Sequence, residues 1–146
     1  MSLQPMTEME RETRESPEAV ARLLDASLGD LIGLGRRLSA LAPPVVVTSA
    51  RGTSDHAAGY LKYLLEIATG TPVASLGPSL ASVYGAPLRL HGSVLFTISQ
   101  SGRSPDIVAL QDAARAAGAL TVALVNVADS PVSKAADVVI PLCAGV

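Results

Sequence analysis

Residues 99–104 contain three serines and a glycine, and they lie between an apolar, strand-like run and a helix-like run. The stretch reads Ser-Gln-Ser-Gly-Arg-Ser and is followed by Pro105. At a helix start, unpaired backbone N–H groups and the positive end of the helix dipole favour an anion. Serine hydroxyls add small donors, and glycine lets the backbone approach a ligand closely. The stretch therefore predicts a phosphate-binding loop, with Ser104 as the helix N-cap and Pro105 as the first helical residue.

An ordinary capped turn is the alternative interpretation, with the serines serving only as caps. A second hydroxyl-rich junction favours the anion site. It spans residues 49–54 and also lies between a strand-like and a helix-like run. Gly52 would permit a tight turn, and Thr53 and Ser54 would offer hydroxyl groups. Arg51 would add charge if it points inward, and would otherwise be a solvated surface arginine.

Other side chains with catalytic potential are better explained by the fold. Residues 53–56 carry the residue types of a hydrolase triad, but neighbours at a helix start project in different directions. We expect His56 to pack against the sheet, with an acid–base role toward a sugar as the alternative. Asp106 suits the positive end of a helix, and the single cysteine, Cys143, suits a small buried apolar residue at a strand end. The sequence identifies no catalytic residue, no cofactor and no metal site.

Composition excludes several classes of function. The 146 residues are 49% hydrophobic, which is enough for one domain with a substantial core but not for two. A formal net charge of -2 and 3% aromatic residues offer nucleic acid neither a basic surface nor a stacking platform. There is no apolar run of the roughly 20 residues that a membrane span needs, and the N-terminus is acidic. We expect a cytoplasmic protein with neither nucleic acid nor membrane as a partner.

The elements that position the two junctions follow from the hydrophobic periodicity. Residues 7–15 predict a solvated helix, and Ser16-Pro17-Glu18 predicts the start of a new helix that ends at Pro43-Pro44. Strands that are apolar along their whole length are typical of a parallel sheet covered on both faces. The pattern thus predicts an α/β fold with three α-β-α layers and a doubly wound sheet in flavodoxin-like order. About five strands are expected, at 45–49, 72–75, 93–98, 120–126 and 137–142, with helices at 54–68 and 105–117.

Both junctions resemble those of the sugar isomerase (SIS) domain family. The resemblance runs from Ser16-Pro17-Glu18, through residues 51–58 and 99–106, to Asn126 and Ser130-Pro131, and covers nearly the whole chain. The chain is similar in particular to the first half of double-SIS proteins, which are related to glucosamine–fructose-6-phosphate aminotransferase and to sugar-type glucosamine-6-phosphate deaminases. The resemblance implies a sugar-phosphate site in the crevice. The substrate-binding residues expected on this basis are Gly52, Thr53, Ser54, Ser99, Gln100, Ser101 and Ser104.

The resemblance also implies an organisation with an N-terminal helical segment at 1–43 and a phosphosugar-binding SIS domain at 44–146. In the resembled family the catalytic glutamate and lysine follow an Ala-Gly dipeptide at the start of the second half, whereas Ala144-Gly145-Val146 are the last residues here. We therefore expect the chain to bind a hexosamine 6-phosphate but to turn it over slowly.

Two function classes stay open from the sequence. One is an aldose–ketose isomerase or deaminase acting on a sugar phosphate, and the other is a phosphosugar sensor that regulates a partner. A dinucleotide-binding domain is ranked last, because Arg51-Gly52-Thr53-Ser54 stands where Gly-x-Gly-x-x-Gly would be needed. The apolar composition and the leucine-rich N-terminal helix predict a homodimer.

Overall fold

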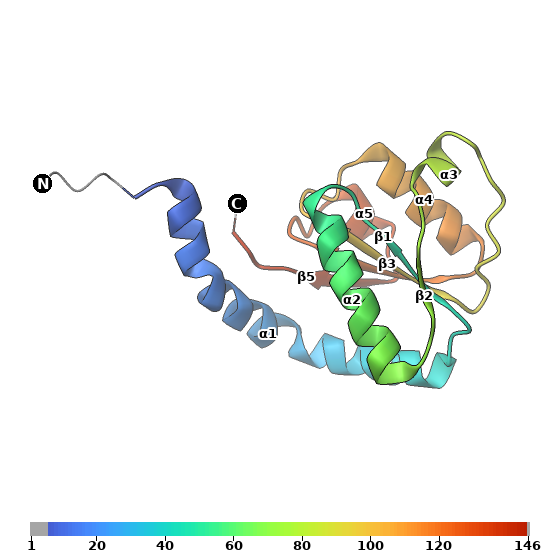
Figure 1. Cartoon of the computed structure of the whole chain (residues 1–146), viewed down its shortest axis with the longest axis horizontal. Helices are drawn as coiled ribbons and strands as arrows, with labels where there is room; N and C mark the ends of the chain where they lie inside the picture. The colour runs from blue at the N-terminus through green and yellow to red at the C-terminus, as the bar shows by residue number, and fades with distance from the viewer. Residues whose placement is uncertain (1–5, 146) are drawn as a thin grey trace, which may run out of the picture.

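A five-stranded parallel sheet forms the centre of the computed structural model, which describes residues 6–145 (Figure 1). The strand order is β2-β1-β3-β4-β5, and every neighbouring pair is parallel. This is the doubly wound, flavodoxin-like order predicted from the sequence. The elements in chain order are α1 (Glu8–Leu41), β1 (Val46–Ser49), α2 (Thr53–Thr69), β2 (Val73–Ser75), α3 (Ser79–Ser82), β3 (Val94–Ser99), α4 (Pro105–Ala116), β4 (Leu120–Val125), α5 (Pro131–Lys134) and β5 (Val138–Pro141).

Burial on both faces explains why the central strands are apolar throughout. Every residue of β1 and of β3 is buried. Val46, Val94 and Phe96 join a cluster with Leu34 of α1, whereas Val47 and Leu95 join a cluster with Ala114 of α4. Because successive side chains of a strand point to opposite faces, helices must cover both sides of the sheet.

The helix α1 is continuous from Glu8 to Leu41, so the predicted helix start at Ser16-Pro17 is wrong. Pro17 lies inside the helix, where a missing N–H normally weakens the helical ladder. Side-chain contacts lie on either side of the proline. The Ser16 hydroxyl donates to the Glu12 carbonyl at 3.3 Å, and Arg22 pairs with Glu15 at 2.8 Å across it. The helix therefore continues through Pro17, where residue propensity alone predicts two helices.

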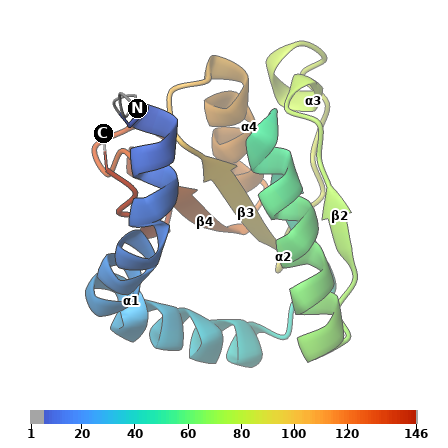
Figure 2. The same ribbon diagram turned by 60° about the vertical axis from the view of Figure 1, so that its left-hand side comes forward.

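The first turns of α1 extend past the sheet (Figures 1 and 2). The last turns of α1 pack with α2 on the same face of the sheet, where Leu34 and Leu65 belong to one cluster. Arg22 of α1 also donates to the Cys143 carbonyl at 3.1 Å, which fastens α1 to the segment after β5. Cys143 is half-buried and has φ 54°, so the expectation of a buried residue ending a strand is wrong. Within residues 6–145, no helix combines the length and apolarity that crossing a membrane would require.

Candidate functional site

The two hydroxyl-rich junctions meet at one cavity at the carboxyl edge of the sheet. Residues 46–49 of β1 pair with 94–97 of β3, so the turns that follow these strands lie side by side. The cavity has a volume of about 180 Å³, enough for several waters at about 30 Å³ each or for one phosphate group. Its lining consists of Arg51, Ser54, Ile98, Ser99, Gln100, Ser101, Ser104 and Ile107.

The serine loop, residues 99–104, is held in shape by bonds within itself and to its neighbours. Gly102 has φ +60°, and its N–H donates to the Ser99 hydroxyl oxygen at 3.0 Å. The Gly102 carbonyl accepts from the Val132 N–H at 3.1 Å, and the Gln100 carbonyl accepts from the Asn126 N–H at 3.2 Å. A Cβ on Gly102 would collide with the Ser130 side chain. The loop is therefore fixed before any ligand arrives.

Neither helix that starts at the cavity is capped by a side chain. Ser104 is the N-cap of α4 and Pro105 follows it, as predicted, but the Ser104 hydroxyl makes no capping bond. Gly52 is the N-cap of α2, with φ 59° and ψ -133°, a conformation that is nearly restricted to glycine. The Ile107 N–H donates to the Asp106 carboxylate and the Asp55 N–H to the Gly52 carbonyl. The other N–H groups of the two helix starts, with the nearby hydroxyls, remain available to an anion.

An ion pair spans the mouth of the cavity. The Arg51 guanidinium, from the turn before α2, donates to the Asp106 carboxylate in the first turn of α4. The other Asp106 oxygen accepts from the Ile107 N–H at 3.0 Å. Arg51 is therefore part of the cavity lining, and its side chain is directed toward Asp106 while remaining mostly exposed. Asp106, expected only to complement the helix dipole, also sets the position of this arginine.

Five of the seven predicted binding residues line the cavity. They are Ser54, Ser99, Gln100, Ser101 and Ser104. Gly52 shapes the turn without lining the cavity, and Thr53 is exposed.

His56 is also exposed, so the expectation that it packs against the sheet is wrong. The inward positions of α2 are Ala58, Leu61 and Leu65, which recur at helical spacing, and His56 falls outside that register.

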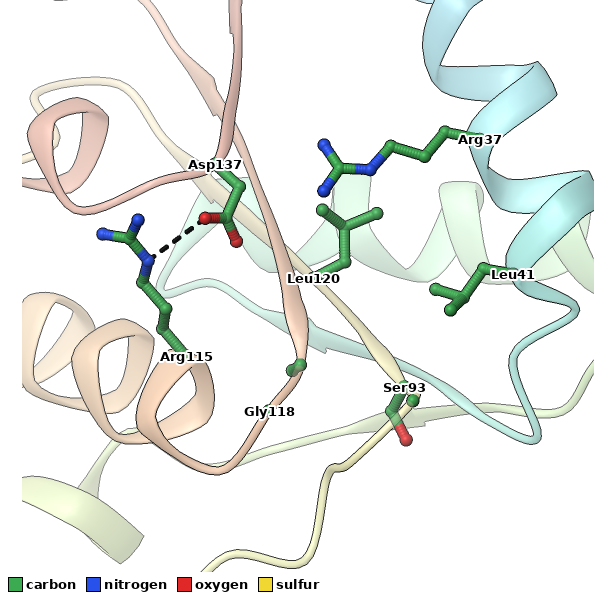
Figure 3. A pocket seen from close by; sticks show the side chains of 9 residues that line it. Arg37, Leu41, Ser93, Arg115, Gly118, Leu120 and Asp137 are labelled. Carbon is green, nitrogen blue, oxygen red and sulfur yellow. Dashed lines mark ion pairs between the residues drawn. The ribbon is translucent and has the colours of Figure 1, made fainter.

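A second hollow lies at the opposite, amino edge of the sheet (Figure 3). There Asp137 accepts from Arg115 Nε at 3.1 Å and from the N–H and hydroxyl of Thr121 at 3.0 and 2.8 Å. Burial raises the pKa of the Asp137 carboxyl, but the Thr121 hydrogen bonds and the charges of Arg115 and Arg37 outweigh it, leaving the pKa below its usual value. These contacts tie α4 and β4 to the start of β5. The Asp137 cluster is therefore a structural feature of the sheet edge.

The described residues, 6–145, contain no group of three or more histidine, cysteine or acidic side chains arranged to hold a metal ion.

Comparison with known proteins agrees with this geometry. Residues 44–145 match the SIS domain family. The glutamine–fructose-6-phosphate aminotransferase (isomerizing) of Sulfurisphaera tokodaii is 32% identical over 139 residues, which cover 94% of this chain and 23% of that enzyme. The chain therefore spans about a quarter of the length of this curated relative.

Solved structures share the same fold. A protein of Silicibacter pomeroyi DSS-3 designated a phosphosugar isomerase superposes with a TM-score of 0.90 at 49% identity, over 93% of this chain and 42% of its own. The NanR protein of Vibrio vulnificus, solved with ManNAc-6P, superposes with a TM-score of 0.67 at 20% identity, over 88% of this chain and 50% of its own. The second likeness concerns the fold alone.

Proposed function

Because the chain belongs to the SIS domain family, we propose that the serine loop binds the phosphate group of a hexose or hexosamine 6-phosphate. The observation that carries this proposal is the meeting of two helix starts without side-chain caps at one small polar cavity. A phosphate placed there gains backbone N–H donors, hydroxyl donors and the field of two helix dipoles together. With the phosphate against the serine loop, the sugar ring would lie toward the mouth of the cavity, beside α2.

The binding residues have different tasks in this proposal. The Ser101 and Ser104 hydroxyls donate to the phosphate, since neither is used in a strong bond within the chain. The Ser99 oxygen holds the loop through Gly102, and its own hydrogen stays available to the ligand. Ser54 and Gln100 line the same cavity and would contact the ligand from its two sides. Gly52 and Thr53 form the turn that brings Ser54 into place.

The chain is, in this proposal, the phosphosugar-binding part of an isomerase- or deaminase-like protein. The relatives in the aminotransferase family support the substrate class. None of the eight residues described as lining the cavity is a histidine, a lysine or a carboxylate. General acid–base catalysis needs such a group within hydrogen-bonding reach and contributes about 10²–10⁴-fold. The phosphate cavity itself therefore supplies no general base, and the chain spans about a quarter of its curated relative; we propose binding with slow turnover for this chain on its own.

Calorimetry with the purified chain tests the proposal. Glucosamine 6-phosphate and fructose 6-phosphate should bind, and plain glucosamine should bind far more weakly, because the site recognises the phosphate. Equal affinity for glucosamine with and without its phosphate would refute the proposal. An assay for isomerisation or deamination on the same sample should show slow turnover, and an ordinary enzymatic rate would mean that a general base exists within these residues.

We also propose a homodimer, because helices α1 and α2 expose many large apolar side chains. Tyr60, Tyr63, Leu64 and Ile67 recur at helical spacing on α2, and Ile67 is 81% exposed. Soluble monomers rarely leave such a stripe open to water. Light scattering at tens of micromolar, on the order of ordinary assay concentrations, should report a dimer, and a monodisperse monomer would contradict it.

We propose further that residues 1–43 serve as a helical segment on an SIS domain formed by 44–146. A cytoplasmic location fits a chain whose one cysteine is free.

A further inference from the structure

The ion pair between Arg51 and Asp106 joins the two helix starts that form the cavity. Arg51 is the only charged residue among the eight described as lining it. Its side chain is 64% exposed, so the guanidinium lies at the mouth of the cavity and not beneath it. Whatever enters the cavity must pass close to this pair.

Asp106 places a negative charge at the helix start that is proposed to receive a phosphate. Its side chain is only 22% exposed, and it is fixed from two sides, by the Ile107 N–H and by Arg51. A carboxylate in the first turn stabilises a helix, but it repels a second anion at the same place. The Arg51 charge cancels that repulsion as long as the two groups stay paired.

We propose that Arg51 masks the Asp106 carboxylate, and that this masking sets the affinity of the cavity for phosphate. The inference rests on the proposed function, since it takes the serine loop as the phosphate site. Asp106 stabilises the start of α4 and joins it to the α2 turn, and Arg51 makes this carboxylate compatible with a bound phosphate. In this arrangement Arg51 acts through Asp106 and through its charge, and direct contact with the phosphate is not required.

Arg51 could instead contact the phosphate directly, and this alternative predicts a different result from masking of Asp106. If Arg51 bound the phosphate through its planar guanidinium, the loss caused by removing it would persist after Asp106 was also neutralised. If Arg51 acts by masking, the Asp106 substitution should restore binding. Lysine in place of Arg51 should also suffice for masking, because it supplies the charge without the fork of donors.

The test is a double-mutant cycle on the full chain, measured by calorimetry with glucosamine 6-phosphate. Arg51→Gln should weaken binding by about tenfold or more. The double variant Arg51→Gln with Asp106→Asn should return to within about threefold of the unaltered chain, and Arg51→Lys should remain near it. Asp106→Asn keeps the side-chain volume and the oxygen that accepts from Ile107, so α4 should still begin at the same residue.

Arg36→Gln is the matched control, because it removes one exposed positive charge from α1, outside the serine loop and the cavity lining. It should change the affinity by less than about threefold, as expected for a solvent-screened charge. Thermal melting of each variant checks that it is folded. Two results would overturn the masking role of Arg51 without affecting the proposed function: a double variant that binds as weakly as Arg51→Gln, or an Arg51→Gln variant that binds like the unaltered chain. If the unaltered chain binds no sugar phosphate, both the proposed function and the masking role of Arg51 are refuted.

Discussion

Gly102→Ala should both destabilise the protein and abolish sugar-phosphate binding, because the serine loop depends on a glycine there. Gly102 has φ +60°, where a residue with a Cβ costs about 1–2 kcal/mol. The added methyl would also meet the Ser130 side chain, which is fully buried and bonded to Ser133 at 2.7 Å. Overpacking of this kind costs about 1–3 kcal/mol. The two contributions together predict a loss of about 2–5 kcal/mol in the free energy of unfolding.

Urea denaturation would measure this loss, and thermal melting should show a midpoint lower by about 10 °C. Gly59→Ala is the matched control, since Gly59 lies in α2 with open space around its Cβ position. That variant should be slightly more stable, by about 0.5–1 kcal/mol. If Gly102→Ala unfolds at the same urea concentration as the unaltered chain and still binds glucosamine 6-phosphate, the described loop geometry is wrong.

Three further substitutions probe other parts of the structure. Ser104→Ala should weaken binding by roughly tenfold or more while changing the unfolding free energy by less than about 0.5 kcal/mol, since its hydroxyl makes no capping bond; a loss of about 1 kcal/mol in stability with unchanged binding would instead identify an ordinary cap. Asp137 has a lowered folded-state pKa, so its contribution to stability is present above its unfolded pKa of about 3.9 and is lost as the pH falls through the folded value. Urea titrations at about pH 5 and about pH 3 should therefore show a smaller acid-induced loss for Asp137→Asn than for the unaltered chain, and equal losses would contradict the assignment. Pro17→Ala should slow amide hydrogen exchange in the first turns of α1, because it restores the helical N–H donor that proline lacks, and unchanged exchange would show that the missing donor does not weaken this part of the helix.

The fold could be predicted from the sequence because it depends on the alternation of apolar strands and amphipathic helices along the chain. Uniformly apolar strands separated by helices indicate a parallel sheet, and the observed order β2-β1-β3-β4-β5 is the one expected for such a pattern. The same order brings the turns after Ser49 and Ser99 together, so the shared cavity could also be predicted. The continuity of α1 through Pro17 could not be predicted in this way, because local propensity favours a helix start at Ser16-Pro17.

Side-chain direction accounts for most of what the sequence did not reveal. The sequence identified Arg51 and Asp106 but gave no reason to pair them, since they are 55 residues apart and meet only once β1 and β3 are adjacent. His56 is two residues before the inward Ala58, a rotation of about 200° around α2 that turns it to the exposed side, and this depends on where the helix begins. Thr53 carries a suitable hydroxyl, yet as the first residue of α2 it is exposed and lies outside the cavity lining.

The most direct test of the proposed site is to follow the backbone amide resonances of the chain during titration with glucosamine 6-phosphate. The phosphate site predicted here requires the largest shifts over residues 100–107 and at Ser54, with little change around Asp137 at the opposite edge of the sheet. Plain glucosamine at the same concentrations should leave residues 100–107 nearly unchanged. Shifts centred on the hollow beside Arg115 and Asp137, or no shifts with either sugar, would contradict the assignment of the serine loop as the phosphate site.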